Sequence, residues 1–236
     1  MDVSMRGERS YDDPCGIARA LDLVGERWAL LMVRELVFGP KRFTDLRRGL
    51  PGPSQNVLAQ RLRELRRDGI VEQIRLGPPA ATQAYRLTER GRGLEPILLE
   101  LARWGSDLPI TSGAELSTDA LMFALRATYR PRTRSTRRVE YELQLEPDRF
   151  QVVLDGPEIQ VARAAAVSPD AVITTSPPIL RDLIYTGRPL DQAIADNLIM
   201  IEGNRRAIVR LIGSFRQPPL PIDPDASTLP RPNDGS

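Results

Sequence analysis

Four polar side chains between residues 55 and 68 have the types and the spacing needed to contact nucleic acid. They recur at intervals of four, three and four residues: Asn56, Gln60, Arg63 and Arg67. A helix places residues at these intervals on one face. Amide and guanidinium groups hydrogen-bond to base edges in a major groove or to phosphates. Because such a face is more often an ordinary solvated surface, the DNA hypothesis needs support from the neighbouring elements.

The same segment has an apolar face and clear helix ends. Leu58, Leu62 and Leu65 fall opposite the polar side chains and must face a core. Ser54 offers an N-cap hydroxyl, and Gly69 follows the last turn, where a left-handed residue is wanted. We therefore predict a helix of about four turns here.

A two-stranded ribbon should follow this helix. Ile70 to Leu76 has strand character, Gly77 to Ala81 reads as a turn, and Ala84 to Leu87 returns as a strand. Helix and ribbon together form a winged helix, in which arginines of the ribbon reach phosphate or the minor groove. The expected DNA-binding residues are Ser54, Gln55, Asn56, Gln60, Arg63, Arg67, Arg75 and Arg86.

The positive charge of the chain is concentrated in this region. Residues 41–92 contain one lysine and eleven arginines against five carboxylates, a net charge of +7, whereas the whole chain carries only +2. The flanks are both net negative, with −2 for residues 1–40 and −3 for residues 93–236. A basic segment around an outward polar helix is what binding to a polyanion requires.

The residue inventory excludes several classes of function. The chain has no histidine and a single cysteine, so the usual imidazole general bases, zinc sites and disulfide frameworks are not available. No phosphate-binding loop or convincing carboxylate pair suggests an enzyme, and we expect no cofactor and no metal. The N-terminus lacks a signal peptide and no apolar run could span a membrane, so we expect a cytoplasmic protein.

Two earlier segments complete a helix-turn-helix. Ile17 to Val24 and Arg27 to Phe38 read as helices, the second with a buried stripe, and Phe43 to Leu46 as a short helix capped by Thr44. The predicted stripe consists of Trp28, Leu31, Met32 and Leu36. These segments give two helices joined by a compact turn, and the second helix has a polar outward face. This is the order of a helix-turn-helix.

A further helix is expected after the wing. Thr88 can cap a helix that runs to about Trp104, with an apolar stripe at Leu94, Leu98, Leu101 and Trp104. Such a stripe is more often core than interface. Because the preceding helices already supply the core of a small winged helix, however, we expect this helix to pair two copies in a homodimer.

The segment from Cys15 to about Gly105 resembles the HxlR family of bacterial winged-helix regulators. The resemblance rests on C-G-I-A-R-A-L-D-L-V-G-E-R-W-A-L-L-M-V-R-E-L, R-F-T-D-L-R-R, N-V-L-A-Q-R-L-R-E-L-R-R-D-G-I-V-E and Y-R-L-T-E-R-G. It implies a dimeric transcription factor, which we expect to act as a repressor on a double-stranded DNA operator.

A second domain is predicted after a linker at residues 108–116. A helix over Thr118 to Tyr129 precedes three strands, a further strand at Ala171 to Thr175, two helices, a strand and a last helix. The fold class is α+β, with two domains: residues 13–107 and 117–216. Residues 1–12 are an expected flexible N-terminus, and residues 217–236 an expected disordered, proline-rich tail.

The order of these elements resembles the sterol carrier protein type 2 fold, through V-V-L-D-G, D-A-V-I-T-T, L-I-Y-T-G-R-P-L and I-M-I-E-G-N-R-R-A-I-V-R-L. That resemblance implies an apolar tunnel for a hydrophobic small-molecule effector. The candidate lining residues are Leu121, Met122, Leu125, Leu180, Leu183, Ile184 and Leu198. Residues of this kind are more often simply core.

Cys15 is a second candidate for a regulatory input. It precedes the first helix, where unpaired N–H groups favour a thiolate, and some members of the HxlR family sense oxidants or electrophiles with a cysteine at this place. Asp12 and Asp13 beside it disfavour a thiolate. A small, unreactive residue is an equal alternative. A lipid or metabolite carrier that uses its first domain only for dimerisation is the other alternative, which the basic segment disfavours.

Overall fold

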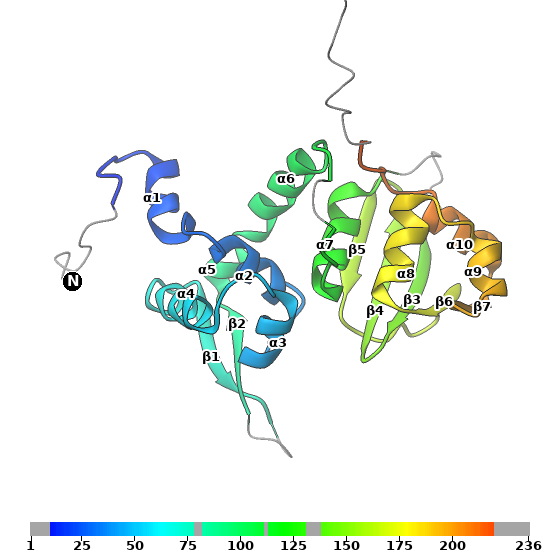
Figure 1. Cartoon of the computed structure of the whole chain (residues 1–236), viewed down its shortest axis with the longest axis horizontal. Helices are drawn as coiled ribbons and strands as arrows, with labels where there is room; N and C mark the ends of the chain where they lie inside the picture. Colours follow the sequence, from blue (N-terminus) through cyan, green and yellow to red (C-terminus); the bar gives the residue numbers. More distant parts are fainter. Residues whose placement is uncertain (1–9, 78–81, 111–112, 131–137, 220–236) are drawn as a thin grey trace, which may run out of the picture.

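The computed structural model describes residues 10–77, 82–110, 113–130 and 138–219, which form two parts lying side by side (Figure 1). Several predicted segments fall wholly or mostly outside this description: the N-terminal segment, the tip of the wing and the proline-rich tail. Within the described segments, no helix has the length and apolar character needed to cross a membrane.

The first part is a winged helix-turn-helix. Its elements are α1 (Gly16–Val24), α2 (Ala29–Leu36), α3 (Phe43–Gly49), α4 (Gln55–Arg67), β1 (Val71–Arg75), β2 (Gln83–Leu87), α5 (Glu89–Arg92) and α6 (Glu95–Gly105). Strands β1 and β2 pair antiparallel and form the wing. The predicted sequence of helices followed by a two-stranded ribbon is confirmed.

Two details of the first helices differ from the prediction. Thr44 is not an N-cap: the N-cap is Arg42, two residues earlier, which makes no side-chain capping bond, and α3 begins at Phe43. The chain is held extended up to this point because Lys41 forms a β-bridge with Tyr85 of the wing. Leu31, which was predicted as part of the buried stripe, is 38% exposed. The face of α2 that contacts the core contains Met32, Val33 and Leu36 instead.

The helix predicted after the wing is divided in two. The Thr88 hydroxyl accepts a hydrogen bond from the Gly91 N–H, as expected of a cap, but α5 ends at Arg92. Helix α6 begins at Glu95, with Pro96 in its first turn. Proline has no N–H and clashes with the carbonyl one turn earlier, so it is accommodated at a helix start rather than within one. Pro96 thus explains the interruption.

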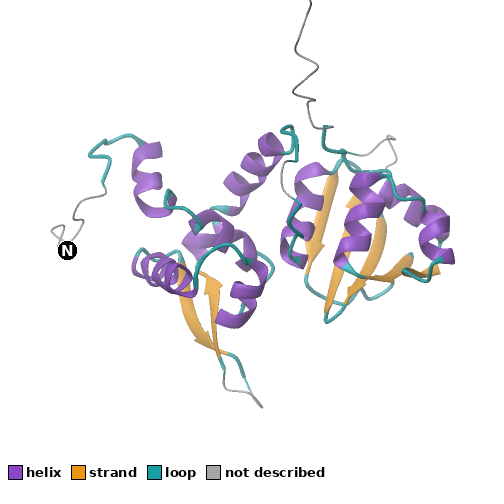
Figure 2. Ribbon diagram, viewed as in Figure 1, coloured by secondary structure: helices purple, strands orange, loops and turns teal. Residues whose placement is uncertain are grey.

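The second part is an α+β unit with one five-stranded sheet (Figure 2). Its elements are α7 (Thr118–Thr128), β3 (Val139–Leu145), β4 (Asp148–Asp155), β5 (Glu158–Ala162), β6 (Ala171–Thr175), α8 (Pro177–Arg181), the π-helical turn η1 (Asp182–Thr186), α9 (Leu190–Ala195), β7 (Ile199–Gly203) and α10 (Arg205–Ile212). The strand order is β5-β4-β3-β6-β7, in which β3 and β6 are parallel and the other pairs antiparallel. The element order is the predicted one.

One face of this sheet is apolar. Tyr141 lies opposite Val152, and Leu143 opposite Phe150, with all four side chains fully buried. The Tyr141 hydroxyl donates a hydrogen bond to the Ala207 carbonyl of α10, at 3.0 Å, and burial raises the pKa of this tyrosine to about 12. The core of this part is continuous with that of the winged helix.

Candidate nucleic-acid interface

Helix α4 presents the two faces that its sequence predicts. Leu58, Leu62 and Leu65 are at most 2% exposed and pack into the core. The polar side chains at Asn56, Gln60, Arg63 and Arg67 are all exposed. The Ser54 hydroxyl caps the helix by accepting a hydrogen bond from the Val57 N–H at 3.3 Å, and Gly69 has the left-handed conformation expected after the last turn, with φ +68°.

The outward side chains of α4 differ in their existing partners. Gln60 Nε2 donates to Glu64 Oε1 at 3.0 Å, and Arg67 Nε donates to Asp68 Oδ1 at 3.1 Å. The bond to Asp68 raises the pKa of Arg67 further above its ordinary value, so this guanidinium stays charged. Arg63 has no hydrogen bond or ion pair with another described residue. The same is true of Asn56, so these two side chains have no bond to a described residue to exchange when they meet a ligand.

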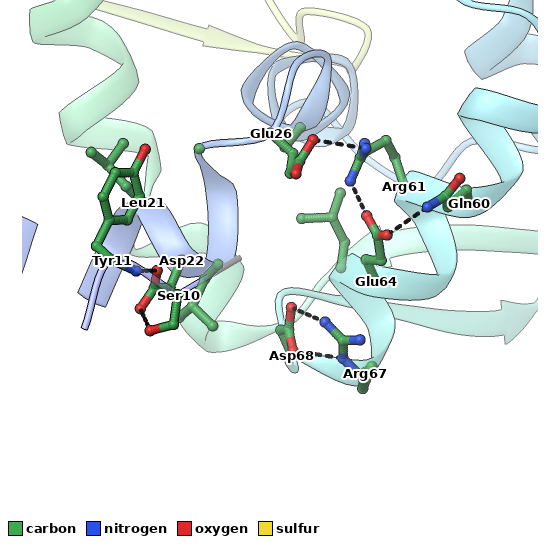
Figure 3. A pocket seen from close by; sticks show the side chains of 14 residues that line it. Ser10, Tyr11, Leu21, Asp22, Glu26, Gln60, Arg61, Glu64, Arg67 and Asp68 are labelled. Carbon is green, nitrogen blue, oxygen red and sulfur yellow. Dashed lines mark hydrogen bonds and ion pairs between the residues drawn. The ribbon is translucent and has the colours of Figure 1, made fainter. Parts of the chain in front are cut away.

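A short chain of polar contacts orients the middle of α4 (Figure 3). Arg61, which is mostly buried, forms an ion pair with Glu26 at 2.8 Å and another with Glu64. Glu64 in turn accepts the Gln60 bond. These contacts tie α4 to the segment between α1 and α2, beside a cavity of about 540 Å³. The outward position of Gln60 therefore depends on residues that face the protein.

The turn before α4 is packed tightly. Trp28 adopts a left-handed backbone conformation, with φ +79°, and its indole ring lies over Gly52. A Cβ atom at Gly52 would lie only 2.3 Å from the indole Cη2 atom. Only glycine leaves room for the ring here. Trp28 was predicted as part of the stripe of α2, whereas it precedes that helix and holds the turn.

The wing carries the two predicted arginines on its surface. Arg86 Nε donates to Glu72 Oε1 at 2.7 Å, across the pair of residues that face each other in β1 and β2. Arg75, at the end of β1, is exposed. Gln55, at the start of α4, is exposed as well. Strands and helix thus offer polar groups on neighbouring surfaces.

Arg66 is a candidate contact that the sequence reasoning missed. It lies on the flank of α4 rather than opposite the apolar face, so the helical pattern did not select it. Together with Arg63 and Arg67 it lines a hollow of about 540 Å³ against Val71 and its neighbours in β1. The three arginines are neighbours on α4 because they are three and four residues apart, and the packing of the wing beside α4 makes their surface concave. Their charge suits a phosphate group.

Cys15 is exposed and forms the N-cap of α1. Its Sγ accepts a hydrogen bond from the Ala18 N–H at 3.3 Å, while its own N–H donates to Asp13 Oδ1 at 2.8 Å. The predicted position at a helix N-terminus is therefore as expected. Its reactivity stays a prediction.

The residues predicted to line an effector tunnel are mostly packed in the core. Leu121, Met122, Leu125, Leu180, Leu183 and Ile184 are at most 2% exposed. The seventh, Leu198, is 36% exposed and lines a cavity of about 970 Å³ beside β7 and α9, together with Ile194 and Met200. Side chains packed at core density leave little free space, so a ligand among the first six would have to displace them.

An outward polar helix beside a two-stranded basic wing defines this protein as a winged helix-turn-helix transcriptional regulator. The chain belongs to the HxlR-like helix-turn-helix family, whose model matches residues 23–110.

In the described residues no group of three or more carboxylates or cysteines could hold a metal ion.

Several relatives share this region. The HTH-type transcriptional regulator YdeP of Bacillus subtilis is 39% identical over 93 residues, which cover 39% of this chain and 71% of YdeP. The HTH-type transcriptional regulator Rv3095 of Mycobacterium tuberculosis is 42% identical over 100 residues, or 41% of this chain and 61% of that protein.

Solved structures match the same region. The reduced form of the transcriptional regulator YodB from B. subtilis is 36% identical, with a TM-score of 0.36, over 40% of this chain and 93% of YodB. The oxidized form of the redox regulator HypR is 38% identical, with a TM-score of 0.37, over 41% of this chain and 100% of HypR.

Proposed function

We propose that this protein is a dimeric, sequence-specific DNA-binding regulator, and that it acts as a repressor, with α4 as the recognition helix. The observation that carries the proposal is the exposed polar face of α4 within a segment of net charge +7. Asn56, Gln60 and Arg63 would reach base edges, whereas Arg67 would lie nearer the phosphates. Gln55 and Ser54, at the helix start, would contact the backbone, where helix N-termini favour anions.

The wing supplies the sequence-independent part of binding in this proposal. Arg75 and Arg86 are exposed on the ribbon next to α4 and would contact phosphate or the minor groove. Such contacts fix the register of a protein on the duplex without reading bases. They also release counterions, so binding should weaken as salt rises.

Homodimerisation would use α1 and α6. Trp104 is 67% exposed, and Leu101 and Ile97 are exposed on the same helix. Ile17 and Leu21 of α1 are also exposed. Apolar side chains gathered on helices in this way suit burial against a second copy. A symmetric pair could then hold two α4 helices against major grooves about 34–36 Å apart.

The second part would act as an effector domain of the sterol carrier protein type 2 type. Its support is the element order on which that resemblance rests, and the cavity beside β7 that Leu198 lines. An effector regulates only if it binds one arrangement of the dimer better than another. Titration with an environment-sensitive apolar dye tests the domain, and absence of saturable binding would count against it.

Thiol chemistry at Cys15 is the second candidate for the input, because Cys15 is exposed at the N-terminus of α1. If the effector domain is the sensor, alkylation of wild-type protein with iodoacetamide should leave DNA affinity unchanged, and Cys15→Ser should behave like wild type. Loss of DNA binding on alkylation of wild type, with Cys15→Ser resistant, would favour the thiol instead.

The DNA proposal is tested by selecting genomic fragments retained at physiological salt and measuring affinity for a selected site. Gln60→Ala and Arg63→Ala should each weaken binding by about 1–3 kcal/mol and relax specificity at one position. Arg206→Ala, on the exposed surface of α10, is the matched control and should change nothing. If both α4 variants bind the site like wild type, α4 is not the recognition helix.

A further inference from the structure

The only lysine of the chain joins the two parts of the molecule. Lys41 lies between α2 and α3, and its ammonium group contacts two carboxylates: Glu35 of α2 at 2.7 Å and Asp119 of α7 at 2.6 Å. The side chains of Glu35 and Asp119 are 0% and 3% exposed. Figure 1 shows α7 on the side of the second part that faces the winged helix. One buried cation therefore spans the boundary between the parts.

Further groups satisfy the remaining oxygens of both carboxylates. Arg34 Nη2 lies 2.8 Å from Glu35 Oε1, and the Ser117 hydroxyl donates to the same oxygen at 2.6 Å. Ser117 is the N-cap of α7, so α7 contacts Glu35 directly. Gly49 of α3 leaves the space that the carboxylate occupies, because a Cβ atom there would lie 2.2 Å from Glu35 Oε2.

The network extends to the sheet of the second part. Arg163, which follows β5, lies 2.7 Å from Asp119 Oδ1 and also pairs with Asp148 of β4. Three cations and three carboxylates thus meet at the boundary. Removal of one partner from such a group leaves a buried charge unpaired, which costs more than the loss of an exposed pair.

Aromatic contacts lie next to the charges. Phe38, after α2, meets Phe150 of β4 edge to face, with ring centroids 5.7 Å apart. The Arg163 guanidinium lies over Phe150, 4.6 Å from the ring centroid. Both rings are buried, so they keep water from the neighbouring ion pairs and strengthen them.

The backbone of Lys41 is part of the wing. Its N–H donates to the Tyr85 carbonyl at 2.9 Å, and the Tyr85 N–H donates back to the Lys41 carbonyl at 2.8 Å. Tyr85 lies in β2, next to Arg86, and α3 begins two residues after Lys41. One residue is therefore bonded to the wing through its backbone and to the second part through its side chain.

We propose that Lys41 is a positioning residue through which the second part sets the position of the wing and of α3. Lys41 contributes to the positive charge of residues 41–92. Its ammonium group, however, forms ion pairs with Glu35 and Asp119 rather than with phosphate. A movement of α7 removes Asp119 and Ser117 from this network, and the wing loses a fixed anchor. The DNA readout of this inference rests on the proposed function, whereas its structural readout does not.

The structural test is hydrogen–deuterium exchange of the full-length protein. Asp119→Asn keeps the shape of the side chain and removes its charge. Exchange at β2 and at residues 41–49 should become about tenfold faster, because a charged hydrogen bond that anchors them is weakened. Asp191→Asn removes an exposed ion pair with Arg205 in the same part of the protein, and is the control that should leave the wing unchanged.

A second variant keeps the test decisive if Asp119→Asn does not fold. Arg163→Met removes a partly exposed cation that touches only the second part, and it should also speed exchange in the wing. Unchanged exchange of the wing in the folded variants overturns the proposal.

The second measurement is the affinity for DNA. A role of Lys41 in stability alone would leave the affinity of the folded protein unchanged, whereas a positioning role would not. Asp119→Asn should weaken affinity about two- to thirtyfold with no steeper salt dependence, because the variant loosens the wing and adds no phosphate contact. Tighter binding with a steeper salt dependence overturns the positioning role, since it indicates that Asp119 only masks the charge of Lys41 and that the freed ammonium group reaches phosphate. If wild-type protein binds no DNA while exchange in the wing still responds, the proposed function fails and the coupling stands.

Discussion

The outward side chains of α4 differ in how readily each can reach a base. Gln60 must exchange its bond to Glu64, and Arg67 its bond to Asp68, whereas Arg63 gives up no such bond to a described residue. Both existing bonds are exposed, so breaking them costs little. Because an arginine can pair with a guanine through two hydrogen bonds and also carries a charge, Arg63 is the residue at which we expect the largest loss of affinity on replacement by alanine.

Gly52 offers a prediction at this scale. In Gly52→Ala the new methyl group meets the Trp28 indole, which is itself held in a left-handed conformation. The free energy of unfolding, measured by urea denaturation, should fall by about 1–3 kcal/mol, as is usual for overpacking. Gly113→Ala is the control, because a Cβ atom there meets nothing within 4 Å. Equal stability of the two variants would contradict the role given to Trp28.

Among the elements, the wing combines attraction and repulsion for a polyanion. Arg75 and Arg86 attract phosphate, but Glu72 faces Arg86 across the ribbon and holds its guanidinium. Both side chains of this pair are about half exposed, so the pair adds little to stability. Its larger effect should be on DNA binding.

Glu72→Gln should therefore tighten binding to all DNA sequences. Loss of one negative charge close to the phosphates, and release of Arg86, should raise affinity by about two- to fivefold at low salt. Fluorescence anisotropy with specific and unrelated duplexes would measure this. Glu202→Gln, on the exposed edge strand β7, is the control that should leave affinity unchanged. Tighter binding only to the specific site would mean that Glu72 reads bases instead.

For the whole molecule, the two parts share one continuous core and a buried charge network, while apolar side chains of α1 and α6 remain exposed. Because the second part is packed against α2 and α7 lies beside α6, a second copy has to approach from the other side of α6. We expect the dimer to form there without separating the two parts.

Leu101→Asp tests this arrangement. A charge in a buried apolar interface should raise the dimer dissociation constant by at least about tenfold, measured by sedimentation velocity over a range of concentrations. Val209→Asp, at an equally exposed apolar position on α10, should leave the dimer intact. A wild-type protein that is monomeric at all concentrations, or a Val209→Asp variant with the larger effect, would refute the proposed interface.

The sequence by itself determined those features that depend on near neighbours. The faces of α4, the Ser54 cap, the left-handed Gly69 and the order of helices and strands along the chain all follow from periodicity and local hydrogen bonding, which involve residues a few positions apart. The interruption between α5 and α6 was missed, although Pro96 marked it locally.

Tertiary structure alone decided which residues distant in the chain meet. No local pattern brings Lys41 to Asp119, lays Trp28 over Gly52 or sets β1 beside the arginines of α4. The same holds for Leu31, whose apolar side chain is exposed although its helical spacing predicted a buried stripe. Burial depends on what packs against a helix face, and that is settled only when the whole chain has found its contacts.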